Sequence, residues 1–178
     1  KKDCSSLIKK IQETFRKKSL IVRSSAISED GFLSSSAGMY TSILDIKSTN
    51  FIDLKKAINK VIKSYPDKND NNEVLVQPML KNVLISGVVF TRSLQNGAPY
   101  YTINYDDISG STESITSGTS QDDKTLIIRR DVLSNTKFLP ENLKNILFSI
   151  KEIENLLNYD SLDIEFAITK KFGIHILQ

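Results

Sequence analysis

An arginine at the end of a short apolar run is the first residue whose position suggests chemistry. Leu20, Ile21 and Val22 precede Arg23, and a loop of small residues, Ser34 to Gly38, follows it. The guanidinium offers a planar fork to a phosphate or carboxylate, and the backbone N–H groups of a small-residue loop can approach an anion closely. The same pattern fits an ordinary strand, turn and strand with a surface arginine, which spacing alone favours.

Two carboxylates near the end of the chain form a second candidate site. The side-chain period of a strand is two, so Asp163 and Glu165 fall on one face, and the apolar residues that alternate with them fall mainly on the other. Mg²⁺ is usually held by one or two carboxylates together with substrate phosphates. An acidic strand face that serves only solubility is the alternative. The presence of Arg23 in the same chain favours a site for a triphosphate with magnesium.

The spacing of apolar residues predicts the elements that must position these groups. Helical spacing predicts helices over residues 3–18, 51–64 and 141–157, and Asn50 or Asp53 is available as the N-cap of the second helix. Strand-like runs lie at residues 20–22, 43–46, 74–80, 83–92, 100–105, 125–130, 162–168 and 174–178. We therefore expect an α+β fold with a largely antiparallel sheet and packed helices.

Composition excludes several classes of function. The chain has 178 residues and a net charge of +3, and it has no dense Lys/Arg block with interleaved aromatic residues, so we expect no nucleic-acid partner. Its one cysteine, Cys4, cannot form an internal disulfide, which fits a reducing compartment. We find no signal peptide and no apolar run near the roughly 18 residues of a membrane span. We expect a cytoplasmic protein without a membrane partner, and a fragment of a longer chain.

Five stretches, in order, resemble the ATP-binding domain of phosphoenolpyruvate synthase and pyruvate phosphate dikinase, a domain that rifampicin phosphotransferases share. The stretches are Val22-Arg-Ser-Ser-Ala26 with Glu29-Asp30 and Ser36-Ala-Gly38, then Val76-Gln-Pro-Met79, then Ser86-Gly-Val-Val-Phe-Thr-Arg92, then a degenerate glycine-rich stretch from Ser109 to Gly118, and finally Asp163-Ile-Glu-Phe166 with Ile176-Leu-Gln178. Each motif alone is weak. Their order across residues 20–178 makes the resemblance fairly specific.

The resemblance implies an ATP-grasp-like fold, in which two α+β lobes hold the nucleotide. We accordingly expect residues 1–178 to be a partial nucleotide-binding domain with two possible lobes, about 1–72 and 73–178. The resemblance also implies ATP and Mg²⁺ as the bound cofactors.

By position in the family's motifs, the resemblance implies a role for each candidate residue. Arg23 would contact the phosphates, Gly38 and Ser42 would lie on the phosphate loop, and Gln77 and Met79 would lie at the adenine hinge. Gln178 would approach the metal or the phosphates, and the metal ligands would be Glu165 and Asp163. Arg92 completes the ATP-binding set as a candidate phosphate contact, and an exposed arginine at a strand end is the alternative for it. No catalytic residue is expected within this chain, since His175 sits between two isoleucines and is expected to be structural.

The resemblance further implies an enzyme that uses ATP and water to convert pyruvate to phosphoenolpyruvate. The phosphoryl group would pass through a phosphohistidine on a carrier domain, and a pyruvate-binding domain of the same full-length protein would be the other partner. The chain alone is not expected to complete this reaction. Two alternatives stay open: a degenerate nucleotide-binding or regulatory module, suggested by Met39 and the Ser109 to Gly118 stretch, and a phosphotransferase with a different acceptor.

Overall fold

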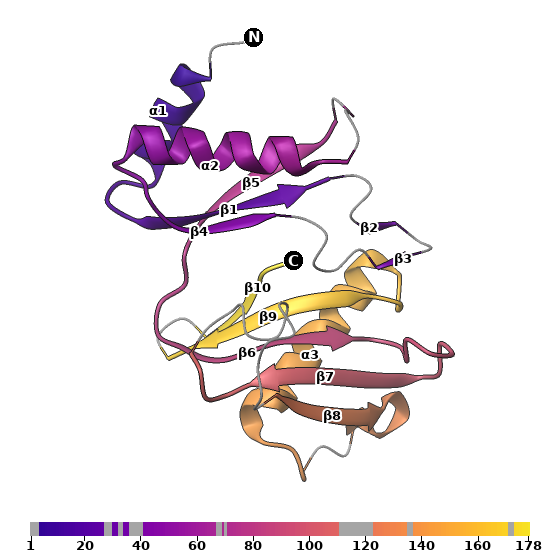
Figure 1. The fold of residues 1–178 in the computed structure, drawn as a ribbon. Coiled ribbons are helices and arrows are strands. Elements are labelled where there is room, and N and C mark those ends of the chain that lie inside the picture. Colours follow the sequence, from indigo (N-terminus) through magenta and orange to yellow (C-terminus); the bar gives the residue numbers. More distant parts are fainter. Residues whose placement is uncertain are drawn as a thin grey trace. The chain divides into compact units, whose positions relative to one another are not determined.

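The computed structural model describes residues 4–26, 30–31, 34–35, 41–66, 69, 71–110, 123–134, 137–170 and 173–178. The chain divides into two compact units, Lys1–Leu80 and Lys81–Gln178, and each unit combines an antiparallel sheet with helices (Figure 1). This α+β architecture confirms the expected fold class. None of the helices in the described residues has both the length and the apolar character needed to cross a bilayer.

The first unit is a three-stranded sheet with two helices packed on one face (Figure 1). The strands lie in the order β4 (Ser42–Lys47), β1 (Ser19–Ser25), β5 (Glu73–Pro78), and both outer strands pair antiparallel with β1. Helices α1 (Ser5–Thr14) and α2 (Phe51–Ser64) pack their apolar stripes against Leu20 and Val22, which are fully buried. Asn50 is the N-cap of α2, because its side-chain oxygen accepts the N–H of Asp53.

The division between the units falls later in the chain than the expected position near residue 72. Strand β5 follows that position, yet it pairs with β1 along six residues and so belongs to the first sheet. Strand β6 (Val83–Phe90) begins the second sheet. The chain therefore passes from one sheet to the other between β5 and β6.

The second unit is a five-stranded antiparallel sheet with one long helix (Figure 1). The strands lie in the order β10 (Gly173–Ile176), β9 (Asp163–Thr169), β6, β7 (Tyr100–Asp106), β8 (Lys124–Arg129). A short 3₁₀ helix, η1 (Arg130–Ser134), follows β8, and α3 (Glu141–Leu157) precedes β9. Strand β6 is the central strand, because it pairs with both β7 and β9.

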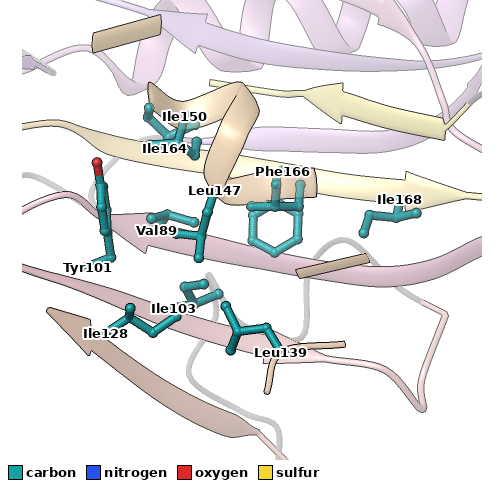
Figure 2. Packing of buried hydrophobic residues seen from close by; sticks show 11 residues of the cluster. Val89, Tyr101, Ile103, Ile128, Leu139, Leu147, Ile150, Ile164, Phe166 and Ile168 are labelled. Carbon is teal, nitrogen blue, oxygen red and sulfur yellow. The ribbon is translucent and has the colours of Figure 1, made fainter. Parts of the chain in front are cut away.

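The core of the second unit lies between the sheet and α3. Apolar side chains from β6, β7, β8 and β9 form this core with those of α3. Figure 2 shows them gathering around Phe166 and Leu147, with Tyr101 at one edge of the cluster. Alternation along each strand then places the intervening side chains, such as Val88 and Glu165, on the face turned away from α3. Gly87 faces the core and lies opposite Phe166 in the ladder, so the ring fills the space that a side chain at residue 87 would need.

Replacing Gly87 by alanine should destabilise the second unit by about 1–3 kcal/mol. The new Cβ would lie 2.5 Å from the backbone oxygen of Asn104 and 2.7 Å from a ring carbon of Phe166, so the strand or the ring must move. Urea unfolding measures the loss. The control is Gly97→Asn, because Gly97 has φ +67° and a Cβ added there would meet no other atom within 4 Å, and asparagine tolerates that conformation. An equal loss at both positions would contradict the steric explanation.

Candidate functional site

Arg23 lies on the face of the first sheet that is turned away from α1 and α2. Leu20 and Val22 point toward the helices, so the alternate residues Ile21 and Arg23 lie on the opposite face. Arg23 pairs with Ser42 of β4, and paired residues share a face with their Cβ atoms about 5 Å apart. Arg23 is half-buried, with its Nε atom shielded from solvent, and Ser42 is exposed. The ladder thus brings two of the predicted residues together.

The predicted hinge residues lie farther along the same sheet. Gln77 pairs with Ile21 and so shares the face of Arg23. Met79 follows β5; its N–H donates to the carbonyl oxygen of Ser19 at 2.9 Å, and its Sδ accepts the N–H of Asp45 at 3.1 Å. Met79 therefore lies near the start of β1 and Arg23 near its end, separated by about 13 Å of strand.

The rest of the predicted phosphate loop is only partly described. Gly38 lies outside the described residues, as do Met39 and most of the Ser109 to Gly118 stretch. At the start of the expected loop, β3 (Ser34–Ser35) pairs antiparallel with β2 (Asp30–Gly31), which precedes the loop.

The two predicted metal carboxylates share the face of the second sheet that is turned away from α3. Asp163 pairs with Phe90 and Glu165 with Val88, and residues two apart on a strand lie about 6–7 Å apart along it. Asp163 is exposed and Glu165 is half-buried. The N–H of Glu165 donates to the carbonyl oxygen of Gln178 at 3.0 Å. The structure therefore brings all three predicted residues close together.

The carboxylate pair fits one kind of metal site and not another. Among the described residues, no three His, Cys, Asp or Glu side chains gather into a group that could hold a metal ion. A closed site of four protein ligands, as for structural zinc, is therefore not formed by these residues. Two carboxylates on one strand face do fit Mg²⁺, which takes its other ligands from water and substrate phosphates.

Arg92, at the end of β6, has protein acceptors for all three of its nitrogen atoms. Its Nε and Nη2 donate to the carboxylate of Asp160 at 3.0 and 2.6 Å, and its Nη1 donates to the carbonyl oxygen of Gly97 at 2.9 Å. The hydrogen bond and charge of Asp160 raise the pKa of Arg92, and the same hydrogen bond lowers the pKa of Asp160. The expected contact of Arg92 with ATP stays a prediction, and these protein partners are a finding of the structure.

A buried carboxylate that the sequence analysis missed lies beside this pair. Glu154 of α3 is 3% exposed and accepts hydrogen bonds from Arg130 at 2.5 and 2.9 Å and from the hydroxyl of Tyr101 at 2.9 Å. The guanidinium of Arg130 also lies 4.6 Å from the centre of the Tyr101 ring. Glu154 falls on the apolar stripe of α3. That position was a usable signal, because an acid facing a core needs buried partners.

The sequence matches the family described as the pyruvate phosphate dikinase AMP/ATP-binding domain over residues 1–138. The chain belongs to this family. The match confirms the resemblance and identifies an ATP-binding domain from a family of enzymes. It covers the first unit and strands β6, β7 and β8, and it ends before Asp163, Glu165 and Gln178. A comparison with curated proteins gave no match.

The hydroxyl of Tyr101 should make this family member sensitive to alkali. Burial, and then the hydrogen bond to Glu154, raise the pKa of Tyr101, so the neutral hydroxyl stabilises the fold below the ordinary tyrosine pKa of about 10. That stability is lost as pH rises above this value. Tyr101→Phe should be less stable than wild type at pH 8. The difference between their free energies of unfolding should narrow by about 1 kcal/mol between pH 10 and pH 11. Urea unfolding at the three pH values measures it, and a constant gap would contradict the argument.

Proposed function

We propose that the chain is the ATP-binding domain of a phosphotransferase similar to phosphoenolpyruvate synthase. The phosphoryl group of ATP passes to a phosphohistidine on a carrier domain, and from there to pyruvate on another domain of the same full-length protein. His175 is not assigned the carrier role, since its Nε2 lies 3.1 Å from Thr169 Oγ1 within the β9–β10 hairpin. The proposed setting is the cytoplasm.

The common face of β1, β4 and β5 is the observation that carries the nucleotide part of this proposal. Arg23 and Ser42 face each other across the ladder and are proposed to bind the phosphates, for which a guanidinium and a hydroxyl are suitable donors. Gly38 is proposed to contribute to the phosphate loop. Gln77 and Met79 are proposed to lie at the adenine, where backbone groups read the base edge. The spread of these residues along β1 suits an extended nucleotide.

The carboxylates of Asp163 and Glu165 are proposed to hold Mg²⁺, with Gln178 beside them. Bound Mg²⁺ supplies positive charge that neutralises the phosphate oxygens. Phosphoryl transfer depends mainly on positioning and on stabilisation of charge. The proposed contribution of this chain is therefore to bind and orient ATP, and the transfer itself needs the carrier domain.

Calorimetric titration of the full-length gene product with ATP and Mg²⁺ tests the proposal. We expect wild type to bind, and Glu165→Gln to weaken binding by about tenfold or more because a metal ligand is lost, with little change in melting temperature. Glu152→Gln, an exposed change on α3, is the matched control. Equal loss of binding and of stability would make Glu165 structural. A folded wild-type protein that does not bind ATP would overturn the proposal and favour a regulatory module.

Arg23→Ala should weaken ATP binding by about 1.5–3 kcal/mol, the range for a hydrogen bond to a charged group. The loss should persist without Mg²⁺, since the guanidinium is proposed to contact phosphate oxygens directly. The same titration measures it. Arg16→Ala, an exposed arginine of the first unit, is the control and should bind as wild type does. Unchanged affinity in Arg23→Ala would remove Arg23 from the site.

A further inference from the structure

We propose that Arg92 and Asp160 form a clamp that positions the start of β9, and that Arg92 does not contact ATP. The clamp would hold the strand that carries Asp163 and Glu165. This inference rests on the metal role proposed above for those two carboxylates. It makes Arg92 and Asp160 positioning residues for the site.

Thr91, the buried neighbour of Arg92 in the sequence, supports the clamp by binding the backbone of the same segment. Its N–H donates to the carbonyl oxygen of Leu162 at 2.9 Å, its hydroxyl accepts the N–H of Leu162 at 2.7 Å, and the same hydroxyl donates to the carbonyl oxygen of Asp160 at 2.8 Å. Thr91 is 0% exposed. These three bonds fix the backbone of residues 160–162 against the end of β6, one residue before Asp163.

Arg92 secures the same segment through its side chain. Its two bonds to the carboxylate of Asp160 form a bidentate pair, and its third nitrogen is bonded to Gly97 in the turn between β6 and β7. Bidentate arginine–carboxylate pairs constrain orientation as well as distance. The guanidinium thus joins the β6–β7 turn to the segment that leads into β9.

Arg130 of η1 also contacts both ends of this arrangement. Nη1 of Arg130 donates to the carbonyl oxygen of Thr91 at 2.8 Å, and Nη2 lies 3.8 Å from Oδ2 of Asp160. Helix α3 ends at Leu157, and its C-cap Asn158 has the left-handed conformation, at φ +50°. Only residues 158–162 connect this helix to β9. The short connection is therefore held at Thr91, at Arg92 and at Arg130.

A phosphate contact and a positioning role for Arg92 predict different effects of Asp160→Asn on nucleotide binding. A phosphate-binding Arg92 would have to give up a bidentate partner, and the carboxylate of Asp160 would repel the phosphate. Removing that charge with Asp160→Asn would then leave nucleotide binding intact or improve it. A positioning role predicts the opposite, because Asp160→Asn loosens the clamp as much as a change at Arg92 does.

A double-mutant cycle on the full-length gene product separates these roles. Mg²⁺ is titrated in the presence of the non-hydrolysable ATP analogue AMPPNP for wild type, Arg92→Gln, Asp160→Asn and the double variant. Each single change should raise the Mg²⁺ concentration at half-saturation about three- to tenfold. This effect is at or below the smallest loss of metal affinity that is typical when a direct hydrogen-bond partner of a metal ligand is removed. The double variant should be no worse than either single one. Binding of AMPPNP without Mg²⁺ should be unchanged.

The control is Asp131→Asn, which breaks another bidentate pair, with Arg129 at the β8–η1 junction, and should not alter the Mg²⁺ dependence. Weaker metal-free AMPPNP binding in Arg92→Gln, with Asp160→Asn unchanged or tighter, would overturn the inference in favour of a phosphate contact. Equal loss of stability and of all binding in the single variants would overturn it in favour of a general structural role. A folded wild type that does not bind AMPPNP with Mg²⁺ would overturn the proposed function itself.

Discussion

Antiparallel pairing around two central strands decides where the candidate side chains lie. Strand β1 in the first unit and β6 in the second each pair on both sides, and each buries one row of side chains beneath helices. A slip of one residue would turn Leu20 and Val22 of β1, or Ile164 and Phe166 of β9, away from the helices, and would turn Arg23 or Glu165 toward them. Each fully buried large apolar side chain contributes about 1.5–3 kcal/mol, more than a typical exposed polar contact. The cores therefore fix the faces on which Arg23 and Glu165 lie.

The buried carboxylate of Glu154 constrains the second unit in a different way. Removing an ionised group from water costs several kcal/mol, which a bidentate partner and further hydrogen bonds only offset. Arg130 and Tyr101 supply those bonds, and Lys151 Nζ lies 3.3 Å from the carboxylate. The net stabilisation is small, but any packing that separated Glu154 from Arg130 would leave a buried charge unpaired. The pair thus favours a single arrangement of α3, η1 and β7, and with it the place where α3 ends and the chain turns toward β9.

Local patterns predicted the elements well, and non-local pairing explains what they missed. The common face of Asp163 and Glu165 follows from a period of two within one strand, so the sequence was sufficient. Helix α1 is shorter than the expected 3–18, ending at Thr14, and Lys17 beyond it has φ +57°, a conformation that does not continue a helix. The pairing of β5 with β1 could not be read from spacing, because β5 is nearer in sequence to β6. The contact of Arg92 with Asp160 could not be predicted either, because the two residues are 68 positions apart in the sequence. A position in a motif indicates the type of residue and not its partner.

Strand pairing links the residues matched by the family to β9, which lies outside the match. The matched residues end at 138, yet β6 lies inside the match and one of its edges pairs with β9 from Val83 to Phe90. Without β9, one edge of β6 would be unpaired, and the core around Val89 would lose Ile164 and Phe166. The matched part of the second sheet therefore requires a strand of this apolar pattern at this edge. Once that strand is in register with β6, Glu165 must lie beside Val88 and Asp163 beside Phe90, on the face turned away from α3. The location of the two carboxylates thus follows from the fold of the matched region, even though the match itself stops before them.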